Sequence, residues 1–283
     1  MNDDNYFESL NKGSIYKADL EFANKYNIQD FDPHTIITQH GLMNIVAPTN
    51  SGKTVFIVDC LSKIHKHYER VLMFSPTAKV QKIYDFLPRS HIYDHYDEQV
   101  LIDLYEDRKK QKENDIPLEP TLIILDDIIS SPEFIKSKII NKYAISGRHY
   151  FFTIFILSQN FTSLRPIIRN NACWSVSFDL DSYNERKKFC EQYLSTKNNR
   201  VGMILFRKII HEKPYQLVLI ENYKVGVDVE EKVKKYIANP DIKPFKVTKN
   251  PFTIDPEPSK DVTEEGLKIN RKQKVQKGLK LSM

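Results

Sequence analysis

The sequence is poor in cysteine and has no long apolar segment. Its three cysteines, Cys60, Cys173 and Cys190, are an odd, scattered set without metal-ligand spacing. This pattern argues against zinc and indicates buried thiols in a reducing compartment. No apolar run approaches the roughly 20 residues that a membrane helix needs. The acidic start, residues 1–4, has no apolar signal segment, so we expect neither a signal peptide nor a membrane span.

A strong charge of one sign is also missing. The formal net charge of +5 permits a polyanionic partner but does not require one. The sequence has no internal repeat, no basic groove interleaved with aromatic residues and no base-reading helix, so we expect no sequence-specific recognition of nucleic acid. The length of 283 residues fits one large domain with extensions, or two small domains.

The most informative stretch is a short loop between two apolar segments. Residues 42–46 predict a buried strand, and the apolar residues of 55–61 recur at helical spacing, so a helix should begin near Gly52. A strand, a small-residue turn, Gly-Lys-Thr and a helix together indicate a phosphate-binding loop. Its backbone N–H groups and the helix N-terminus would hold phosphate oxygens. The residues expected to bind nucleotide are Ala47, Pro48, Thr49, Asn50, Ser51, Gly52, Lys53 and Thr54.

The loop suggests a role for each polar residue at its end. Lys53 would reach the β- and γ-phosphates, and the hydroxyl of Thr54 would bind Mg²⁺. Ala47 stands where this kind of loop usually has glycine, which removes some turn freedom but keeps the spacing to Gly52. We therefore expect the loop to bind the phosphates of ATP, with Mg²⁺ as the metal.

Two further strands are predicted to end in polar residues. Asp126 and Asp127 follow the apolar run 122–125, and Gln159 follows the run 155–157. Asp126 would hold Mg²⁺ and Asp127 would polarise the attacking water. Gln159 would bond to the γ-phosphate or to that water. Since parallel strands share one carboxyl edge, these side chains should meet the loop in one crevice.

Such a site needs a cation for the charge of the transition state. Arg148, Arg165 and Arg169 lie around the fourth strand, and any of them could act as an arginine finger, in cis or from a neighbouring subunit. At least one of them is expected to be an ordinary surface arginine.

The remaining pattern alternates strands with helices, which predicts a three-layer α/β domain with a mainly parallel sheet. We expect an N-terminal arm at 1–40, an ATPase domain at 41–239 and a flexible basic tail at 240–283. Predicted strands are 42–46, 71–75, 91–93, 121–125, 151–157, 173–178 and 215–220. Predicted helices are 17–26, 52–67, 80–86, 99–114, 132–145, a short one within 162–170, 182–194 with Ser182 and Glu185 as a capping box, and 201–209.

Together these segments resemble the genome-packaging ATPases of large eukaryotic DNA viruses, the poxvirus-type branch of the FtsK–HerA superfamily. The similarity extends from about residue 44 to 178. The loop is generic among ATPases, whereas the order of Asp-Asp, Gly-Arg-His, Ser-Gln and Ile-Arg-Asn-Asn is much more specific. These motifs lie at 47–54, 122–127, 147–149, 156–159 and 167–171.

The resemblance implies a RecA-like P-loop ATPase fold with an extra strand between the two strands that carry the nucleotide motifs. It implies a pentameric or hexameric ring that threads double-stranded DNA into a capsid at the sites of virus assembly in the host cytoplasm. The implied partners are this DNA, without sequence specificity, and a capsid or portal vertex protein.

Site residues also carry over from the resemblance. Lys53 and Thr54 become ligands of phosphate and Mg²⁺, Asp126 the Mg²⁺ aspartate and Gln159 the sensor. Asp127 stands where cellular relatives have glutamate, and this shorter base would have to approach the water more closely. Among the arginines, Arg148 is the first choice for the finger and Arg169 the second.

Two other functions share these motifs. A small-molecule or nucleoside kinase has the loop and the Mg²⁺ aspartate but usually lacks a Gln-ended strand beyond it. A nucleotide-dependent switch at the capsid vertex, with little hydrolysis, would be compatible with Asp127. The basic residues of 268–280 could contact DNA phosphates or could simply solubilise the tail.

Overall fold

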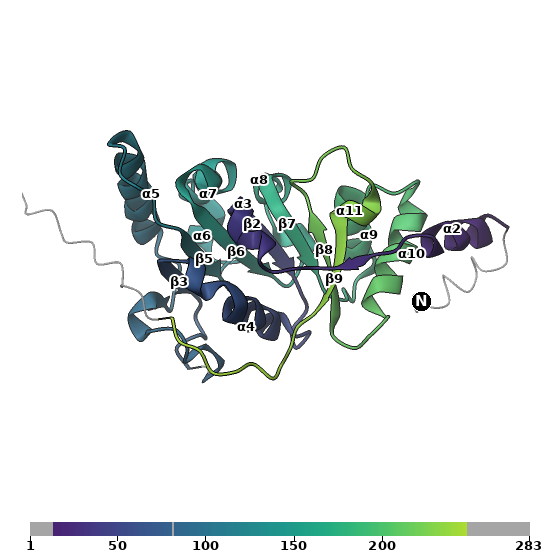
Figure 1. Ribbon diagram of the computed structural model, residues 1–283, viewed down its shortest axis with the longest axis horizontal. Coiled ribbons are helices and arrows are strands. Elements are labelled where there is room, and N and C mark those ends of the chain that lie inside the picture. The colour runs from purple at the N-terminus through teal and green to yellow at the C-terminus, as the bar shows by residue number, and fades with distance from the viewer. Residues whose placement is uncertain (1–13, 81, 248–283) are drawn as a thin grey trace, which may run out of the picture. The chain divides into compact units, whose positions relative to one another are not determined.

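The computed structural model describes residues 14–80 and 82–247. Its strands form one sheet, shown in Figure 1, in the order β1-β9-β8-β7-β2-β6-β5-β3-β4. They are β1 (Gln29–Asp30), β2 (Gly41–Val46), β3 (Arg70–Phe74), β4 (Ile92–Tyr93), β5 (Thr121–Leu125), β6 (Phe152–Ser158), β7 (Ala172–Ser177), β8 (Gln216–Glu221) and β9 (Val233–Ile237).

Helices connect most of these strands. The α-helices of the described residues are α2 (Ser14–Asn24), α3 (Thr35–Gln39), α4 (Lys53–Ile64), α5 (Glu98–Glu113), α6 (Pro132–Lys136), α7 (Ile139–Ser146), α8 (Pro166–Asn171), α9 (Tyr183–Tyr193), α10 (Asn199–Ile210) and α11 (Val229–Lys232). Short 3₁₀ turns are η1 (His65–His67), η2 (Lys82–Tyr84), η3 (Arg89–His91), η4 (Gly147–Tyr150) and η5 (Phe161–Ser163). None of the helices in the described residues is long and apolar enough to cross a membrane.

The sheet is mainly parallel, which confirms the predicted fold class. From β7 to β4 every neighbouring pair is parallel, and only the pairs β7–β8 and β8–β9 are antiparallel. The central strands β2, β5 and β6 are buried along their whole length, as expected of strands covered on both faces. Strand β6 lies between β2 and β5, where the resemblance placed an extra strand.

Layers of helices cover the two faces of the sheet. Met43 and Ile45 of β2 pack in one core cluster with Phe56 of α4. Asn44, between them, points to the opposite face because side chains alternate along a strand, and there it donates to the hydroxyl of Tyr193 in α9. Helix α7 contacts both α5 and α8, and Figure 1 shows these three helices away from α4.

Segments outside the predicted core also pack against the sheet. Phe31 and Ile36, from the predicted N-terminal arm, and Val247, beyond residue 240, belong to the main core cluster. Helix α2 packs on α10 through Ala23 and Val201. The domain boundaries themselves stay predictions, and the basic residues of 268–280 lie outside the described residues.

Some predicted elements differ in the structure. The predicted helix 132–145 is two helices, and the serine between them, Ser137, accepts a hydrogen bond from Tyr96 and donates one to Glu98. The predicted helix 80–86 includes only the single 3₁₀ turn η2 among its described residues. Helix α9 has no side-chain cap from Ser182, and Glu185 instead accepts from the backbone and hydroxyl of Thr162. The proposed capping box was therefore wrong.

Candidate functional site

The loop of residues 47–54 joins the carboxyl end of β2 to the start of α4. Ala47 is fully buried, and its N–H donates to the carbonyl of Ser158 at 2.9 Å, which fixes the start of the loop against β6. The hydroxyl of Ser51 donates to the carbonyl of Pro48 at 2.8 Å and closes a turn. The loop is thus held by two neighbouring strands and by its own turn.

Two residues give the loop its curvature. Asn50 has φ of 62° and Gly52 has φ of 97°, both in the left-handed region. Gly52 has no side chain that could cap α4, so the first N–H groups of the helix are free for an incoming anion. Ala47 does not have positive φ, so the alanine that replaces the usual glycine is not strained at this position.

The carboxylates after β5 face the amine of Lys53. Its Nζ lies 3.2 Å from Oδ1 of Asp127 and 3.5 Å from Oδ1 of Asp126. Asp126 is only 3% exposed, whereas Asp127 is exposed and has a left-handed backbone with φ of 54°. The two carboxylates therefore differ in their access to water although both lie beside one ammonium.

Burial is the main influence on the charge of Asp126. It raises the pKa of this carboxyl above its ordinary value, the nearby Lys53 lowers it and Asp127 raises it again. The hydroxyl of Tyr84 donates to Oδ2 of Asp126 at 3.4 Å. A cation placed at this carboxylate would offset the cost of its burial.

A cavity of about 670 Å³ lies over the loop at the carboxyl ends of the strands. Lys53, Thr54, Asp127 and Gln159 all line it, so the structure brings Gln159 to the same crevice as Lys53. From the loop, Pro48, Thr49, Asn50 and Gly52 also line it, whereas Ser51 lines a neighbouring cavity and Ala47 is buried beneath.

The other half of this cavity is apolar and was missed by sequence reasoning. Its lining residues are Val55, Phe178, Tyr215, Ile237, Ala238 and Pro240. Phe178 follows β7, and its N–H donates to the carbonyl of Val46 at 3.1 Å. Tyr215 precedes β8 and is 71% exposed. No local motif marks Tyr215, Ile237 and Ala238, because β8 and β9 reach the loop only through sheet pairing.

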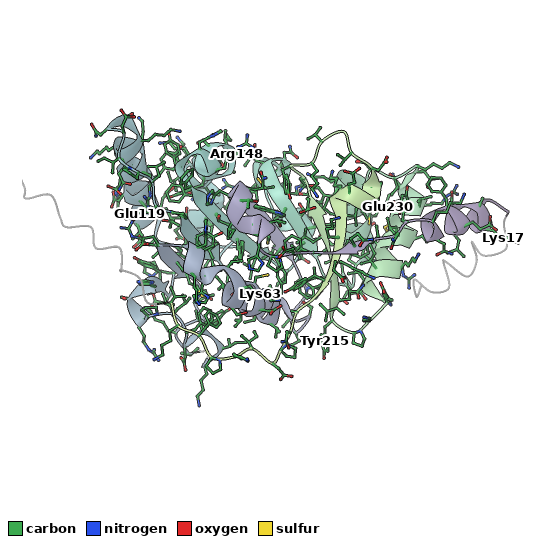
Figure 2. All side chains as sticks on the ribbon, viewed as in Figure 1. Lys17, Lys63, Glu119, Arg148, Tyr215 and Glu230 are labelled. Atoms are coloured by element: carbon green, nitrogen blue, oxygen red, sulfur yellow. The ribbon has the colours of Figure 1, made fainter. Side chains whose placement is uncertain are left out.

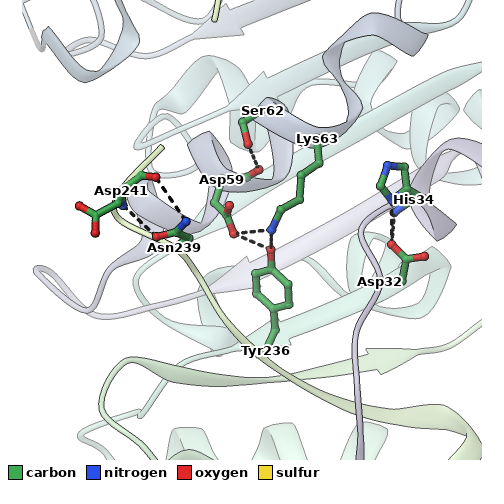
Figure 3. Close-up of polar contacts among 8 residues, drawn as sticks. All are labelled: Asp32, His34, Asp59, Ser62, Lys63, Tyr236, Asn239 and Asp241. Carbon is green, nitrogen blue, oxygen red and sulfur yellow. Dashed lines mark hydrogen bonds and ion pairs between the residues drawn. The ribbon is translucent and has the colours of Figure 1, made fainter. Parts of the chain in front are cut away.

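A polar cluster ties β9 to α4, as Figure 3 shows. The hydroxyl of Tyr236 in β9 donates to Oδ2 of the buried Asp59 in α4, and Nζ of Lys63 lies 3.0 Å from the same oxygen. Lys63 also donates to the hydroxyl of Tyr236. This cluster fixes the end of β9 beside α4, so that Ile237 and Ala238 reach the cavity.

The candidate finger arginines lie away from this cavity. Arg148 in η4 lines a separate cavity of about 280 Å³ near the amino ends of β2 and β7. Arg165 donates to the carbonyls of Ile135 and Ser137, and Arg169 lies over the ring of Phe161. In Figure 2, Arg148 is labelled at the upper side of the molecule and Tyr215 at its lower side.

Thr54 and Asp126 fit Mg²⁺ by their chemistry. Oδ1 of Asp126 is buried without a hydrogen-bond partner, and Thr54 lines the adjoining cavity. Among the described residues, no group of three or more His, Cys, Asp or Glu side chains could hold a metal by itself. Mg²⁺ suits such a sparse site because it takes one or two protein ligands and completes its shell with phosphate oxygens and water.

The fold and the cavity define an α/β protein with a mainly parallel sheet and a candidate anion site where the carboxyl ends of the strands meet a helix N-terminus. A family model described as "Poxvirus A32 protein" matches residues 28–240. The chain therefore belongs to the Poxvirus A32 protein family, which confirms the poxvirus-type family indicated by its motifs. No curated protein matches the sequence.

Several solved structures are similar to this chain. The genome packaging NTPase B204 from Sulfolobus turreted icosahedral virus 2, in complex with AMPPCP, is 16% identical with a TM-score of 0.47, over 73% of this chain and 98% of that one. EssC (ATPases 2 and 3) from Geobacillus thermodenitrificans is 13% identical with a TM-score of 0.49, over 67% and 41%. The pCW3 conjugation coupling protein TcpA with ATPγS is 15% identical with a TM-score of 0.48, over 75% and 62%. Similarity at this level carries no assignment of activity.

Proposed function

We propose that the chain hydrolyses ATP and uses this energy to move double-stranded DNA into a viral capsid. The observation that carries the proposal is the meeting of Lys53, Asp127 and Gln159 in one cavity over the 47–54 loop. These residues follow the carboxyl ends of the three adjacent parallel strands β2, β5 and β6, and such an edge is where α/β proteins bind their ligands. The resemblance of the motif order to packaging ATPases supports the coupling to DNA.

The residues of the site would divide the chemistry as follows. The loop N–H groups and Lys53 bind the β- and γ-phosphates, and Thr54 and Asp126 hold Mg²⁺. Bound there, Mg²⁺ would neutralise charge on the phosphates. Asp127, exposed at the cavity wall, polarises the attacking water, and Gln159 orients that water or the γ-phosphate. The cavity's apolar half, with Phe178 and Tyr215, holds the nucleobase.

The arginine finger would come from a neighbouring subunit. Of the described residues that line the cavity, none is an arginine. Arg148 and Arg169 lie outside this cavity, so we propose that they act on the nucleotide of a neighbouring subunit in a ring, with each nucleotide at an interface between two copies of the chain.

The proposed partners are double-stranded DNA, bound without sequence specificity, and a capsid or portal vertex protein. The proposed place of action is the site of virus assembly in the host cytoplasm.

A second candidate is a nucleotide-dependent switch with little hydrolysis. It is favoured by the ion pair between Asp127 and Lys53, which occupies the carboxylate that would otherwise act on water. A kinase is disfavoured because Gln159 lines the cavity where an acceptor would have to approach the γ-phosphate.

The test is ATP turnover by the purified full chain, with and without long double-stranded DNA. We expect DNA to stimulate turnover and Lys53→Ala to reduce it by at least about 100-fold, since an enzyme site of this kind acts by positioning and charge. Lys66→Ala, at an exposed lysine in the 3₁₀ turn η1 that directly follows α4, is the matched control and should retain wild-type turnover. Equal rates with and without DNA in every oligomeric state would contradict translocation, and absence of turnover would favour the switch.

A further inference from the structure

A buried tyrosine lies directly beneath the two candidate Mg²⁺ ligands. Tyr84 ends the 3₁₀ turn η2 and is only 1% exposed. Its hydroxyl donates to Oδ2 of Asp126 at 3.4 Å and also hydrogen-bonds with the hydroxyl of Thr54. These two residues come from different elements, the end of β5 and the first turn of α4. One phenol thus connects both halves of the candidate metal site.

The segment that carries Tyr84 is anchored on both sides. Tyr84 packs in the main core cluster with Phe56 and Ile57 of α4. Two residues further on, the ring of Phe86 stacks on Phe245 with centroids 4.5 Å apart, and its carbonyl accepts from the N–H of Val247 at 3.0 Å. The phenol therefore has a fixed position relative to α4, although η2 is only one turn long.

We propose that Tyr84 is a positioning residue whose hydroxyl orients the two oxygens that would hold Mg²⁺, those of Thr54 and Asp126. The inference rests on the proposed nucleotide site. A hydroxyl that binds a metal through its lone pairs must direct its proton elsewhere, and the oxygen of Tyr84, which hydrogen-bonds with Thr54, can accept this proton. The phenol's own proton goes to Oδ2 of Asp126, which leaves Oδ1, 3.5 Å from Nζ of Lys53, as the oxygen that would face the metal.

The phenol remains a donor at physiological pH. A phenol ordinarily keeps its proton near pH 7, so the Tyr84 hydroxyl can donate to Asp126. Mg²⁺ demands near-ideal octahedral geometry, so small rotations of either ligand weaken its binding. Groups that hydrogen-bond to metal ligands typically change metal affinity by about 10- to 100-fold when they are removed.

The test compares ADP affinity in Mg²⁺ with ADP affinity in EDTA, measured by calorimetry on the full chain. Tyr84→Phe removes only the hydroxyl. We expect it to reduce the gain in affinity that Mg²⁺ provides by about 10-fold or more, while affinity in EDTA stays within about 2-fold of wild type. Mn²⁺ binding in the presence of ADP, followed by electron paramagnetic resonance, should weaken in parallel.

Tyr68→Phe is the matched control. Tyr68 is fully buried, belongs to the same core cluster, and donates to Thr153 at 3.0 Å, away from the cavity. The Tyr68→Phe variant should show the same Mg²⁺-dependent gain in ADP affinity as wild type, even if the substitution lowers the stability of the fold. An unchanged gain in Tyr84→Phe would overturn the inference. If wild-type protein binds no ADP in either condition, the proposed function fails, and the inference fails with it.

A double-mutant comparison keeps the test valid if Tyr84→Phe perturbs folding. If Tyr84 acts through Asp126 and Thr54, loss of its hydroxyl should have a smaller effect on Mn²⁺ binding in an Asp126→Asn background than in wild type. Tyr84→Met, which fills the same space without a donor, should match Tyr84→Phe in this assay. Equal effects of Tyr84→Phe in both backgrounds would contradict action through the carboxylate.

Discussion

The two edges of the parallel sheet have different chemistry. The carboxyl edge has the larger cavity, about 670 Å³, with Lys53, Asp127 and Gln159 in its wall. The amino edge has a cavity of about 280 Å³ lined by amides, a thiol and Arg148. Left-handed residues occur at both edges, Asn50, Gly52 and Asp127 at the carboxyl edge and His40 and Phe151 at the amino edge, so the difference lies in the side chains.

This difference separates the motifs of the sequence into two groups. The segments 47–54, 122–127 and 156–159 end at the carboxyl edge, where they form one site. The segments 147–149 and 167–171 lie before β6 and β7, and Arg148, Asn170 and Asn171 line the amino-edge cavity together. Motifs that look like parts of one site in the sequence thus belong to two surfaces.

The largest expected effect tests this division. Arg148→Ala should leave ADP binding by isolated subunits unchanged and should reduce DNA-stimulated turnover by about 10³-fold, because an arginine finger acts on the transition state. Arg148→Ala subunits have an intact nucleotide site, and Lys53→Ala subunits have an intact arginine. Mixing the two should therefore restore part of the activity, measured as ATP turnover at a range of mixing ratios.

The same mixing experiment with Arg169→Ala provides the comparison. If ATP turnover recovers only when Arg169→Ala subunits are mixed with Lys53→Ala subunits, the arginine finger is Arg169 in α8. If neither arginine variant recovers activity with Lys53→Ala, the two edges do not cooperate across an interface, and the ring would lose its support.

A second expected effect concerns the stability of the carboxyl edge. Burial raises the pKa of Asp126, so its charged form destabilises the ligand-free fold at neutral pH and this cost disappears as the pH falls through the folded-state pKa. Asp126→Asn should raise the free energy of unfolding by about 1 kcal/mol at pH 7 and by less near pH 4. Chemical denaturation at both pH values would measure this change.

Asp126→Asn should also lose the Mg²⁺-dependent gain in nucleotide affinity, since an amide is a poor ligand for this metal. Greater stability combined with weaker binding would identify Asp126 as a residue kept for function. A destabilised Asp126→Asn would mean that its contacts with Lys53 and Tyr84 outweigh the cost of burial.

The sequence predicted the parallel core well because local signals agreed there. The apolar run 121–125 predicted β5 with its observed bounds, and Gly-Lys-Thr placed the start of α4. Pattern alone could not separate α6 from α7, because Ser137 interrupts the helix through contacts with Tyr96 and Glu98, which lie far away in the sequence.

The parts of the site that were missed depend on long-range pairing. Strand β9 has a mixed pattern of lysine, tyrosine and isoleucine, and only its pairing with β8 and β1 makes it a strand. Its end reaches the cavity because Tyr236 is bonded to Asp59 in α4. Tyr84 was missed for the same reason, since no local motif connects a tyrosine in a short turn with a carboxylate some forty residues later.

The smallest expected effect concerns the amino edge. His40 precedes β2, and its half-buried ring stacks on Phe151 with centroids 5.0 Å apart. Burial lowers the pKa of His40 to about 4, and His67 contributes to the decrease. A histidine whose pKa is lower in the folded state stabilises the fold above its unfolded pKa, and this stability is lost as the pH falls from about 6.5 towards 4. Acid should thus lower the stability of the amino edge, whereas at the carboxyl edge it protonates Asp126 and removes the cost of its buried charge.

His40→Asn tests this contrast, because asparagine tolerates the left-handed backbone of residue 40 better than most residues. The variant should show a smaller loss of stability between pH 6.5 and 4.5 than wild type, by about 1 kcal/mol or less once solvent screening is allowed for. Thermal unfolding across this range would measure the difference, with His149→Asn, an exposed histidine of the same edge, as the control. If both variants lose stability with the same pH slope as wild type, the acid sensitivity lies elsewhere and the two edges do not differ in this respect.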